Sequence, residues 1–341
     1  MKIYTRAEQF PEYLREMCLS YSQMSHDPEF PMKITDVYAS KIQRAEDPLF
    51  LQAVPSVFEN SKAEYESDDP LLEKKYQVSP GLIRRYHDRV LLLTTDVCDM
   101  HCRHCFRRNF SGSGDGIISD DDLVSAAEYI KSEPGIHEII LSGGDPLTIK
   151  PARLEKIFKT LDIPGRRLVF RIGTRVPVVS PWRITKKLLS VIKRINSLWM
   201  VVQINHPDEI CSRTLSAVKA VRKAGIPLLN QSVLLKGVND SAGILKNLCH
   251  FLVEAGIKPY YIFQGDLAAG TSHLRVPLKR GCEIIKTLRT LISGTAMPVY
   301  AVDLPDGGGK IPLTENYFLR EEKGFFIFCD ADGKEYKYPA E

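Results

Sequence analysis

Apolar, strand-like segments recur at a nearly constant spacing through most of the chain, and this repeat is the strongest constraint on its fold. Six of them end near Thr95, Leu141, Ile172, Ile204, Val233 and Phe263. The last four intervals between these ends are 31, 32, 29 and 30 residues, which is the length of one strand followed by one helix. Because the helices supply the crossovers, six such units predict a parallel sheet. We therefore predict an α/β fold, an open (β/α)6 partial barrel.

The segments on either side of the repeat have a different character. Residues 1–85 contain seven prolines between short helical patterns, which favours a helical cap over a sheet of their own. Residues 296–341 contain short strand-like segments after the sixth helix. We therefore expect an N-terminal helical cap over 1–85, the partial barrel over 86–295, and a small β extension over 296–341.

The composition excludes several classes of protein. The chain has 341 residues, 44% hydrophobic and 26% charged, which is ordinary for a globular protein. Its 46 basic and 42 acidic residues give a net charge of +4, too weak an excess to indicate nucleic acid or a membrane as a partner. The N-terminus lacks the apolar run of a signal peptide or membrane span. Eight cysteines without a regular framework fit a reducing compartment, so we expect a cytoplasmic protein.

Three cysteines follow the first strand of the repeat at CxxxCxxC spacing, namely Cys98, Cys102 and Cys105. Four thiolates complete a zinc site or hold every iron of a cubic iron–sulfur cluster, so three on one loop leave a coordination position open. An open iron can bind a reactant. The residues also allow a zinc site completed by His101 or His104, a thioredoxin-like CxxC pair, or unrelated core thiols. The spacing favours an iron–sulfur cluster among these.

Seven motifs occur along the chain in a fixed order. They are DRVLLLTTDVCDMHCRHCFRRNF from Asp88, LSGGDPL from Leu141, RIGTRVPVV from Arg171, INHPDE from Ile204, NQSVLLKGVND from Asn230, YYIFQGDL from Tyr260 and VDLPDGGGK from Val302. The cysteine motif resembles the signature of the radical S-adenosylmethionine (SAM) enzymes, and the series resembles the lysine 2,3-aminomutase family. The resemblance extends from about Asp47 to the C-terminus. It implies a 4Fe–4S cluster, SAM and pyridoxal 5′-phosphate (PLP) as cofactors.

The resemblance assigns residues at the carboxyl ends of the strands to the cluster and to SAM. It makes the three motif cysteines the cluster ligands. Gly143 and Gly144 lack a Cβ and let the backbone approach a ligand closely, although an isolated pair reads more simply as a strand-to-helix turn. The residues that resemble SAM contacts of the family are Ser142, Gly143, Gly144, Asp145, His206 and Gln231.

A run of three glycines precedes Lys310 near the C-terminus. This is not a phosphate loop of the Walker type, because it lacks the first glycine and the final Ser or Thr of that motif. From the residues alone, Lys310 is a solvated loop lysine. The resemblance instead identifies Lys310 as the catalytic lysine that binds PLP covalently. It also identifies Arg89 and Tyr86 as PLP contacts and favours the neighbouring Arg85 less.

Three charged residues match the substrate contacts of the family. Arg107 matches the residue that binds the carboxylate of the amino acid, and Asp266 and Asp303 match the acids that hold the side-chain ammonium of lysine. Both acids otherwise read as turn residues. The resemblance therefore implies an isomerase that converts L-lysine to β-lysine by a radical 1,2-amino shift.

Two alternatives stay open at this point. One is the lysine 2,3-aminomutase that acts in the modification of elongation factor P, although an intact second acid and glycine loop favour free lysine. The other is a non-catalytic module that binds a cluster or zinc. As partners, the resemblance implies lysine and a reducing electron donor such as flavodoxin or ferredoxin, with assembly into a homo-oligomer as a further expectation.

Overall fold

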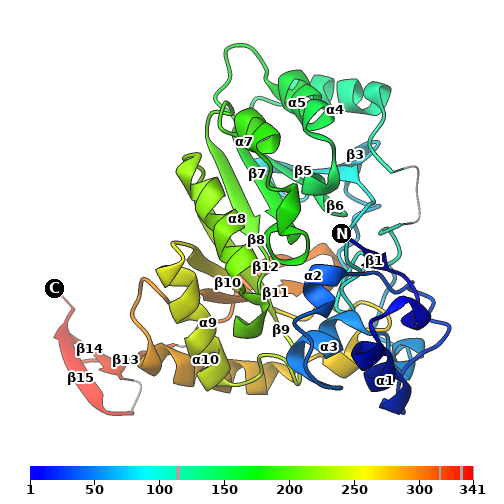
Figure 1. The fold of residues 1–341 in the computed structure, drawn as a ribbon. Helices are drawn as coiled ribbons and strands as arrows, with labels where there is room; N and C mark the ends of the chain where they lie inside the picture. Colours follow the sequence, from blue (N-terminus) through cyan, green and yellow to red (C-terminus); the bar gives the residue numbers. More distant parts are fainter. Residues whose placement is uncertain (113–115, 315, 331–332, 341) are drawn as a thin grey trace.

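A ten-stranded sheet forms the centre of the protein, in the order β12-β11-β10-β9-β8-β7-β6-β5-β4-β3. The computed structural model describes residues 1–112, 116–314, 316–330 and 333–340. Seven neighbouring strands are parallel, namely β5 (Arg89–Thr95), β6 (Glu138–Gly143), β7 (Val169–Thr174), β8 (Leu198–Val202), β9 (Leu228–Leu234), β10 (Lys258–Gln264) and β11 (Val299–Leu304). The ladder of strands is not closed into a ring, so the predicted partial barrel is confirmed (Figure 1).

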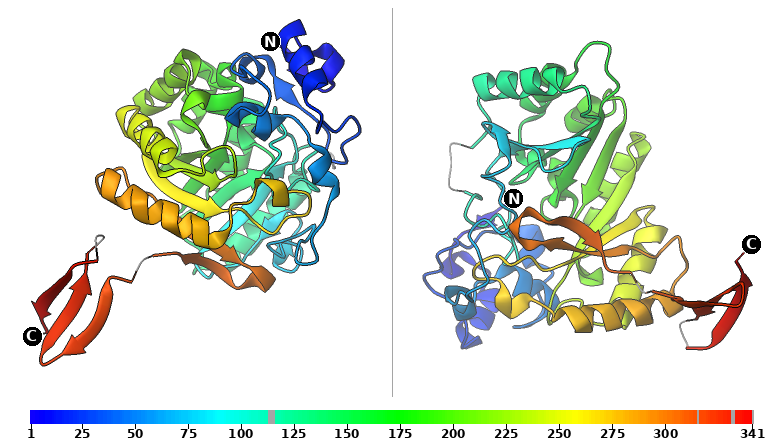
Figure 2. Two further views of the ribbon diagram at one scale, coloured as in Figure 1. Left: turned by 90° about the horizontal axis from the view of Figure 1, so that it is seen from below. Right: turned by 180° about the vertical axis from the view of Figure 1, so that it is seen from behind.

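Helices follow the first six parallel strands and cover the outside of the barrel (Figure 2). They are α4 (Asp120–Ser132), α5 (Pro151–Leu161), α6 (Val176–Val179) with α7 (Lys186–Ile192), α8 (Ser212–Lys223), α9 (Ala242–Glu254) and α10 (Leu278–Leu291). Alternate strand residues such as Val90 and Leu92 are buried in one core cluster with apolar residues of these helices. The other set of residues, which includes Arg89, Ser142 and Arg171, therefore faces the interior of the barrel.

The ends of the helices follow their sequence signals. Ser119 caps α4, because its side chain accepts a hydrogen bond from the Asp122 backbone N–H, and three acids occupy the first turn. Gly256 follows α9 with a φ of +71°, a conformation that favours glycine. These local features fix where each helix returns the chain to the sheet.

The two edges of the sheet carry antiparallel strands. β3 (Gln77–Ser79) and β4 (Leu82–Ile83) extend it beside β5, and β12 (Gly309–Pro312) pairs with β11 so that Asp303 lies opposite Lys310. The Lys310 backbone N–H donates to the Tyr86 hydroxyl at 3.0 Å, which connects β12 to the segment before β5. The Tyr86 side chain thus links the two edges of the open sheet.

The N-terminal cap contains α1 (Glu12–Ser20), α2 (Asp36–Ala39) and α3 (Pro48–Ala53). The expectation that residues 1–85 form no sheet is wrong, because β1 (Ile3–Tyr4) pairs with β2 (Ile34–Thr35), and β3 and β4 join the barrel sheet. Each of these strands has only two or three residues, too few to show a period-two pattern. The exact domain boundaries stay a prediction.

A small sheet projects from the body of the protein at the C-terminus (Figures 1 and 2). It consists of β13 (Phe318–Glu322), β14 (Phe325–Cys329) and β15 (Glu335–Pro339), and it corresponds to the predicted β extension. In the described part of the chain, no helix has the length and apolar character needed to cross a membrane.

Candidate active site

The loop that carries the three cysteines is held in place by the cap. The fully buried Arg103 of this loop donates to Glu59 Oε1 at 2.9 Å and to the Phe30 carbonyl at 2.9 Å. Arg108 donates to the same Glu59 carboxylate and to the Gly270 carbonyl at 2.7 Å. Burial alone raises the pKa of Glu59, but the two arginines outweigh it and lower that pKa. The conformation of the loop therefore depends on residues 44 and more positions away in the sequence.

The structure places Cys98, Cys102 and Cys105 together on this loop, at the carboxyl end of β5, as partly exposed free thiols. Among the described side chains, no group of three or more His, Cys, Asp or Glu residues is arranged to hold a metal ion. Burial, Asp145 and the other two thiols raise the pKa of Cys98, and burial and Cys102 raise that of Cys105 to about 11. Three neighbouring thiols on one loop are the donors that iron–sulfur clusters take, so the donor set fits a 4Fe–4S cluster.

The Gly143-Gly144-Asp145 turn packs directly against the backbone that leads to the cysteines. A Cβ on Gly143 would lie 2.3 Å from the Thr95 carbonyl oxygen, and one on Gly144 would lie 2.5 Å from that of Val97. Both positions thus require glycine because of this close approach. The Asp145 carboxylate accepts hydrogen bonds from the Leu147, Arg175 and Val176 backbone N–H groups and from the Thr174 hydroxyl. Asp145 therefore joins this turn to the end of β7, and its contact with SAM stays a prediction.

His206 lies in the turn after β8, as the sequence indicates, whereas Gln231 lies in the middle of the neighbouring β9. His206 Nδ1 accepts a hydrogen bond from the Asp208 N–H at 3.2 Å, which leaves Nε2 as the protonated nitrogen of the neutral ring. Burial lowers the pKa of His206, although Asp208 and Glu209 oppose this effect. Gln231 is partly exposed on β9 and faces the barrel interior. Their roles as SAM contacts stay predictions.

His104 offers evidence that the site can take a further group. Its Nε2 lies 3.2 Å from Gln203 Nε2 and 3.3 Å from Asn205 Nδ2. Its Nδ1 is buried and has no partner among the described residues. A buried nitrogen without a partner is costly in a complete protein. The residues beside the cysteines therefore fit a polar ligand such as SAM.

Lys310, Asp303 and Asp266 form one electrostatic group at the mouth of the barrel. Lys310 Nζ lies 3.1 Å from Asp303 Oδ2 and 3.6 Å from the centre of the Phe263 ring. Burial lowers the pKa of Lys310, although Asp303 and Asp266 oppose this. Burial and the charge of Asp303 raise the pKa of Asp266 to about 7. The site thus holds an amine that loses its proton more easily than usual, beside two acids.

Arginine side chains beside Lys310 fit the phosphate of PLP. Arg85 Nη1 lies 3.6 Å from Asp303 Oδ1, whereas its Nε and Nη2 are buried and have no partner in the described chain. Arg89 stacks on the Tyr86 ring at 3.8 Å and is paired with Asp88 at 2.9 Å. The family resemblance favours Arg89 over Arg85 as a PLP contact, yet Arg85 is the residue whose buried N–H donors lack partners in the described chain. A phosphate dianion would satisfy these donors.

Arg107 is held by a partner that the sequence did not reveal. Glu73, from the segment before β3, accepts from Arg107 Nε at 2.8 Å and from Nη2 at 2.6 Å. Arg107 Nη1 also donates to the Ser142 hydroxyl at 3.0 Å. These bonds use three of the five guanidinium N–H donors and leave one on each Nη nitrogen. The Nη1–Nη2 end of Arg107 thus stays available for a substrate carboxylate.

A cavity of about 600 Å³ opens beside the Arg107–Glu73 pair. Its lining includes Asp68, Asp69, Asp96 and Asp122 as well as this pair. Carboxylates outnumber basic groups in the lining. The charge of this lining favours cations, but its described residues do not include Asp266, Asp303 or Lys310.

Sequence analysis gave no role to three charged residues that the structure places around the site: Glu73, Arg175 and Glu209. Arg175 and Glu209 lie inside two of the seven motifs, RIGTRVPVV and INHPDE, but the sequence does not indicate that they meet. Glu73 lies in a highly charged segment, where the sequence predicts a solvent-exposed side chain. Only their tertiary contacts reveal these roles.

Comparison with known protein families gives two matches. Residues 92–246 match the radical SAM superfamily, and residues 285–339 match a model described as lysine-2,3-aminomutase. The structure also resembles a radical SAM methyltransferase from Sphaerobacter thermophilus, with a TM-score of 0.48 and 15% identity over 65% of this chain and 68% of that chain.

Comparison with individual proteins gives strong similarities over most of the chain. An L-lysine 2,3-aminomutase of Acetoanaerobium sticklandii is 44% identical over 89% of this chain and 73% of its own length. An L-lysine 2,3-aminomutase of Bacillus subtilis is 41% identical over 91% of this chain and 66% of its own. A glutamate 2,3-aminomutase of Clostridioides difficile is 34% identical over 98% of this chain and 77% of its own.

Proposed function

The chain belongs to the lysine 2,3-aminomutase family of radical SAM proteins, and from this premise we propose that it converts L-lysine to β-lysine. It is an isomerase that uses a 4Fe–4S cluster, SAM and PLP. When bound, the cluster and SAM would supply radical chemistry at an unactivated carbon, and PLP would supply the conjugated system that a 1,2-amino shift requires. No side-chain base can remove a proton from such an unactivated carbon.

In this proposal the protein holds the three cofactors with three groups of residues. Cys98, Cys102 and Cys105 ligate the cluster. The turn from Ser142 to Asp145, with His206 and Gln231, surrounds SAM. Lys310 holds PLP covalently, and Tyr86, Arg89 and Arg85 surround its ring and phosphate. The buried Arg103–Glu59 pair fixes the cysteine loop against the cap.

The proposal that lysine is the substrate is supported by the charges around the substrate site. Arg107 offers two free N–H donors to a carboxylate, whereas Asp266 and Asp303 form a negative pair that raises the pKa of Asp266. An amino acid with a carboxylate at one end and an ammonium at the other matches both. The side-chain carboxylate of glutamate would instead face two acids.

An anaerobic assay with lysine and glutamate tests this proposal. Charge-assisted hydrogen bonds contribute roughly 1.5 to 3 kcal/mol, so Asp266→Asn and Asp303→Asn should each lower lysine turnover by about ten- to a hundredfold or more. Both variants should retain the cluster and PLP. Turnover of glutamate in preference to lysine, or lysine turnover at the parent rate in both variants, would contradict the assignment.

The raised pKa of Asp266 predicts a pH dependence of lysine binding. With a pKa of about 7, Asp266 is protonated and neutral at lower pH and must lose that proton to pair with an ammonium. The KM for lysine should therefore rise by about tenfold for each pH unit below 7 and level off above it. Asp266→Asn should remove this rise. A KM that is constant from pH 5.5 to 7.5, or that increases with pH, would show that Asp266 does not pair with the substrate.

The Glu73–Arg107 pair predicts a separate effect on substrate affinity. If Glu73 orients Arg107 for the substrate carboxylate, Glu73→Gln should raise the KM for lysine by about ten- to a hundredfold and change kcat little, because the lost orientation affects binding. SAM cleavage without substrate should be unaffected. A lower KM would mean that Glu73 competes with the carboxylate instead. Glu155→Gln, in an exposed ion pair with Arg194, is the matched control.

We also propose a cellular compartment, an electron donor and an oligomeric state for the protein. All eight cysteines are free thiols, which suits the reducing cytoplasm and an oxygen-sensitive cluster. A flavodoxin or ferredoxin would supply the electron, and homo-oligomers remain part of the proposal.

A further inference from the structure

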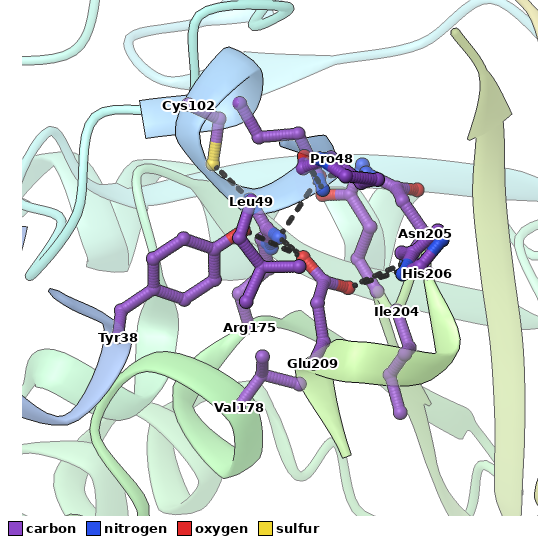
Figure 3. Close-up of polar contacts among 12 residues, drawn as sticks. Tyr38, Pro48, Leu49, Cys102, Arg175, Val178, Ile204, Asn205, His206 and Glu209 are labelled. Carbon is purple, nitrogen blue, oxygen red and sulfur yellow. Dashed lines mark hydrogen bonds and ion pairs between the residues drawn. The ribbon is translucent and has the colours of Figure 1, made fainter. Parts of the chain in front are cut away.

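One arginine connects the cysteine loop to a buried acid at the end of another strand. Arg175 follows β7, and its Nη1 donates to Cys102 Sγ at 2.7 Å. Its Nη2 donates to Glu209 Oε1, within the short turn after β8. Figure 3 shows the Arg175 guanidinium between the Cys102 sulfur and the Glu209 carboxylate. A single cation thus contacts both a cluster cysteine and a fully buried acid.

Further contacts fix the position of the Glu209 carboxylate. The Tyr38 hydroxyl donates to Glu209 Oε1 at 3.0 Å, and the Asn205 backbone N–H donates to Oε2 at 2.6 Å. Gln52 Oε1 accepts from Asn205 Nδ2 at 2.8 Å and from Arg175 Nη2 at 3.3 Å. Tyr38 and Gln52 come from α2 and α3 of the cap. The guanidinium is therefore oriented by residues from the cap as well as from the barrel.

The backbone of Arg175 is fixed as well. Its backbone N–H donates to Asp145 Oδ2 at 2.7 Å, so the Gly143-Gly144-Asp145 turn after β6 fixes the position of the Arg175 backbone. The side chains of Arg175 and Glu209 are 7% and 0% exposed. Bringing two charges out of water is costly, and an apolar pair of similar size would often be as stable. A contact to a cluster cysteine gives this buried ion pair a purpose that stability alone does not.

We propose that Arg175 is a positioning residue for the cluster, which donates a hydrogen bond to the Cys102 sulfur and sets the reduction potential of the cluster. Glu209 holds its guanidinium in place for this contact. This inference rests on the proposed function, because it requires Cys102 to be a cluster ligand.

The direction of the effect follows from charge. Reduction adds one electron from the external donor to the cluster and makes it more negative. A cation and a hydrogen bond at a ligand sulfur favour the reduced form and raise the potential. Without Arg175, the same donor would reduce a smaller fraction of the protein, and less SAM would be cleaved.

The test compares three variants after anaerobic reconstitution with iron and sulfide. Arg175→Gln removes the charge, and Arg175→Lys keeps the charge but loses the planar fork. Arg183→Gln is the matched control, because Arg183 is paired with Asp99 of the same loop and makes no hydrogen bond to a sulfur in the described part of the chain. Iron content, SAM affinity and the cluster midpoint potential, measured without SAM by electron paramagnetic resonance, are the readouts.

We expect Arg175→Gln to lower the equilibrium constant for reduction by about tenfold, which is a shift of about 59 mV to more negative potential for one electron. Arg175→Lys should give a smaller shift, and Arg183→Gln the smallest. An unchanged potential in Arg175→Gln with full iron content would overturn the proposal, and so would a variant whose only defect is weaker SAM binding. If Arg175→Gln fails to fold, an unchanged midpoint potential in Arg175→Lys would overturn the proposal in the same way.

Failure of this inference differs from failure of the proposed function. If the parent protein binds no cluster after reconstitution, the assignment of the three cysteines is wrong. If the parent binds a cluster and isomerises lysine while Arg175→Gln keeps the parent potential, only the role of Arg175 is wrong.

Discussion

Replacing Cys98, Cys102 and Cys105 together with alanine is expected to abolish lysine turnover. Without the three thiolates there is no cluster to cleave SAM, and the reaction has no alternative route through the side chains of the protein. Enzymes accelerate reactions by about a millionfold or more, so the loss should fall below detection. The variant should also show no reductive cleavage of SAM and no iron–sulfur absorbance after reconstitution.

Other cysteines of the chain supply the control for this experiment. Cys282 is an exposed free thiol on α10, far in sequence from the motif, so Cys282→Ala should keep the parent iron content and turnover. The fold should survive in the triple variant, because partly exposed thiols contribute little to the core. If the triple variant still binds its full complement of iron and sulfide, the cysteine assignment is refuted.

The barrel could be predicted from the sequence because its signals are local and repeated. Each unit pairs a buried strand of five to seven residues with an amphipathic helix, and Ser119 and Gly256 mark helix ends through their own backbone contacts. The short strands β1 to β4 could not be found in this way. β1 forms because it pairs with the distant β2, whereas β3 and β4 form a short hairpin beside β5, and in each case two or three residues carry no detectable period.

The site was only partly predictable for the same reason. Residues that motifs identify, such as Lys310 and Asp303, lie within 3.1 Å of each other because β11 and β12 form a hairpin. Glu73 and Glu209 lie 34 residues from the arginines that they hold, and only the fold brings each pair together. Asp145 illustrates the opposite case, because its motif suggested a ligand contact whereas its carboxylate accepts hydrogen bonds mainly from the backbone at the end of β7.

Replacement of Lys310 is expected to have the second largest effect. Its amine is partly buried beside the Phe263 ring, and burial lowers its pKa, so a larger fraction is neutral and able to attack an aldehyde than for a surface lysine. Asp303, 3.1 Å away, orients the amine. Lys310→Ala should therefore lose covalently bound PLP and lower lysine turnover on the order of a thousandfold.

A second lysine of the sheet separates the reactive amine from one whose pKa is lowered at another place in the fold. Burial also lowers the pKa of Lys258 on β10, but its Nζ donates to the Thr295 and Met297 carbonyls and lies away from the acids of the site. Treatment with PLP and borohydride, followed by peptide mapping, should therefore label Lys310 and leave Lys258 unlabelled. Lys258→Ala should keep the parent turnover. Label on Lys258 or another lysine, or PLP bound covalently to Lys310→Ala, would exclude Lys310 as the PLP lysine. Cluster content should be unchanged in Lys310→Ala, because the lysine lies on β12 and the cysteines follow β5.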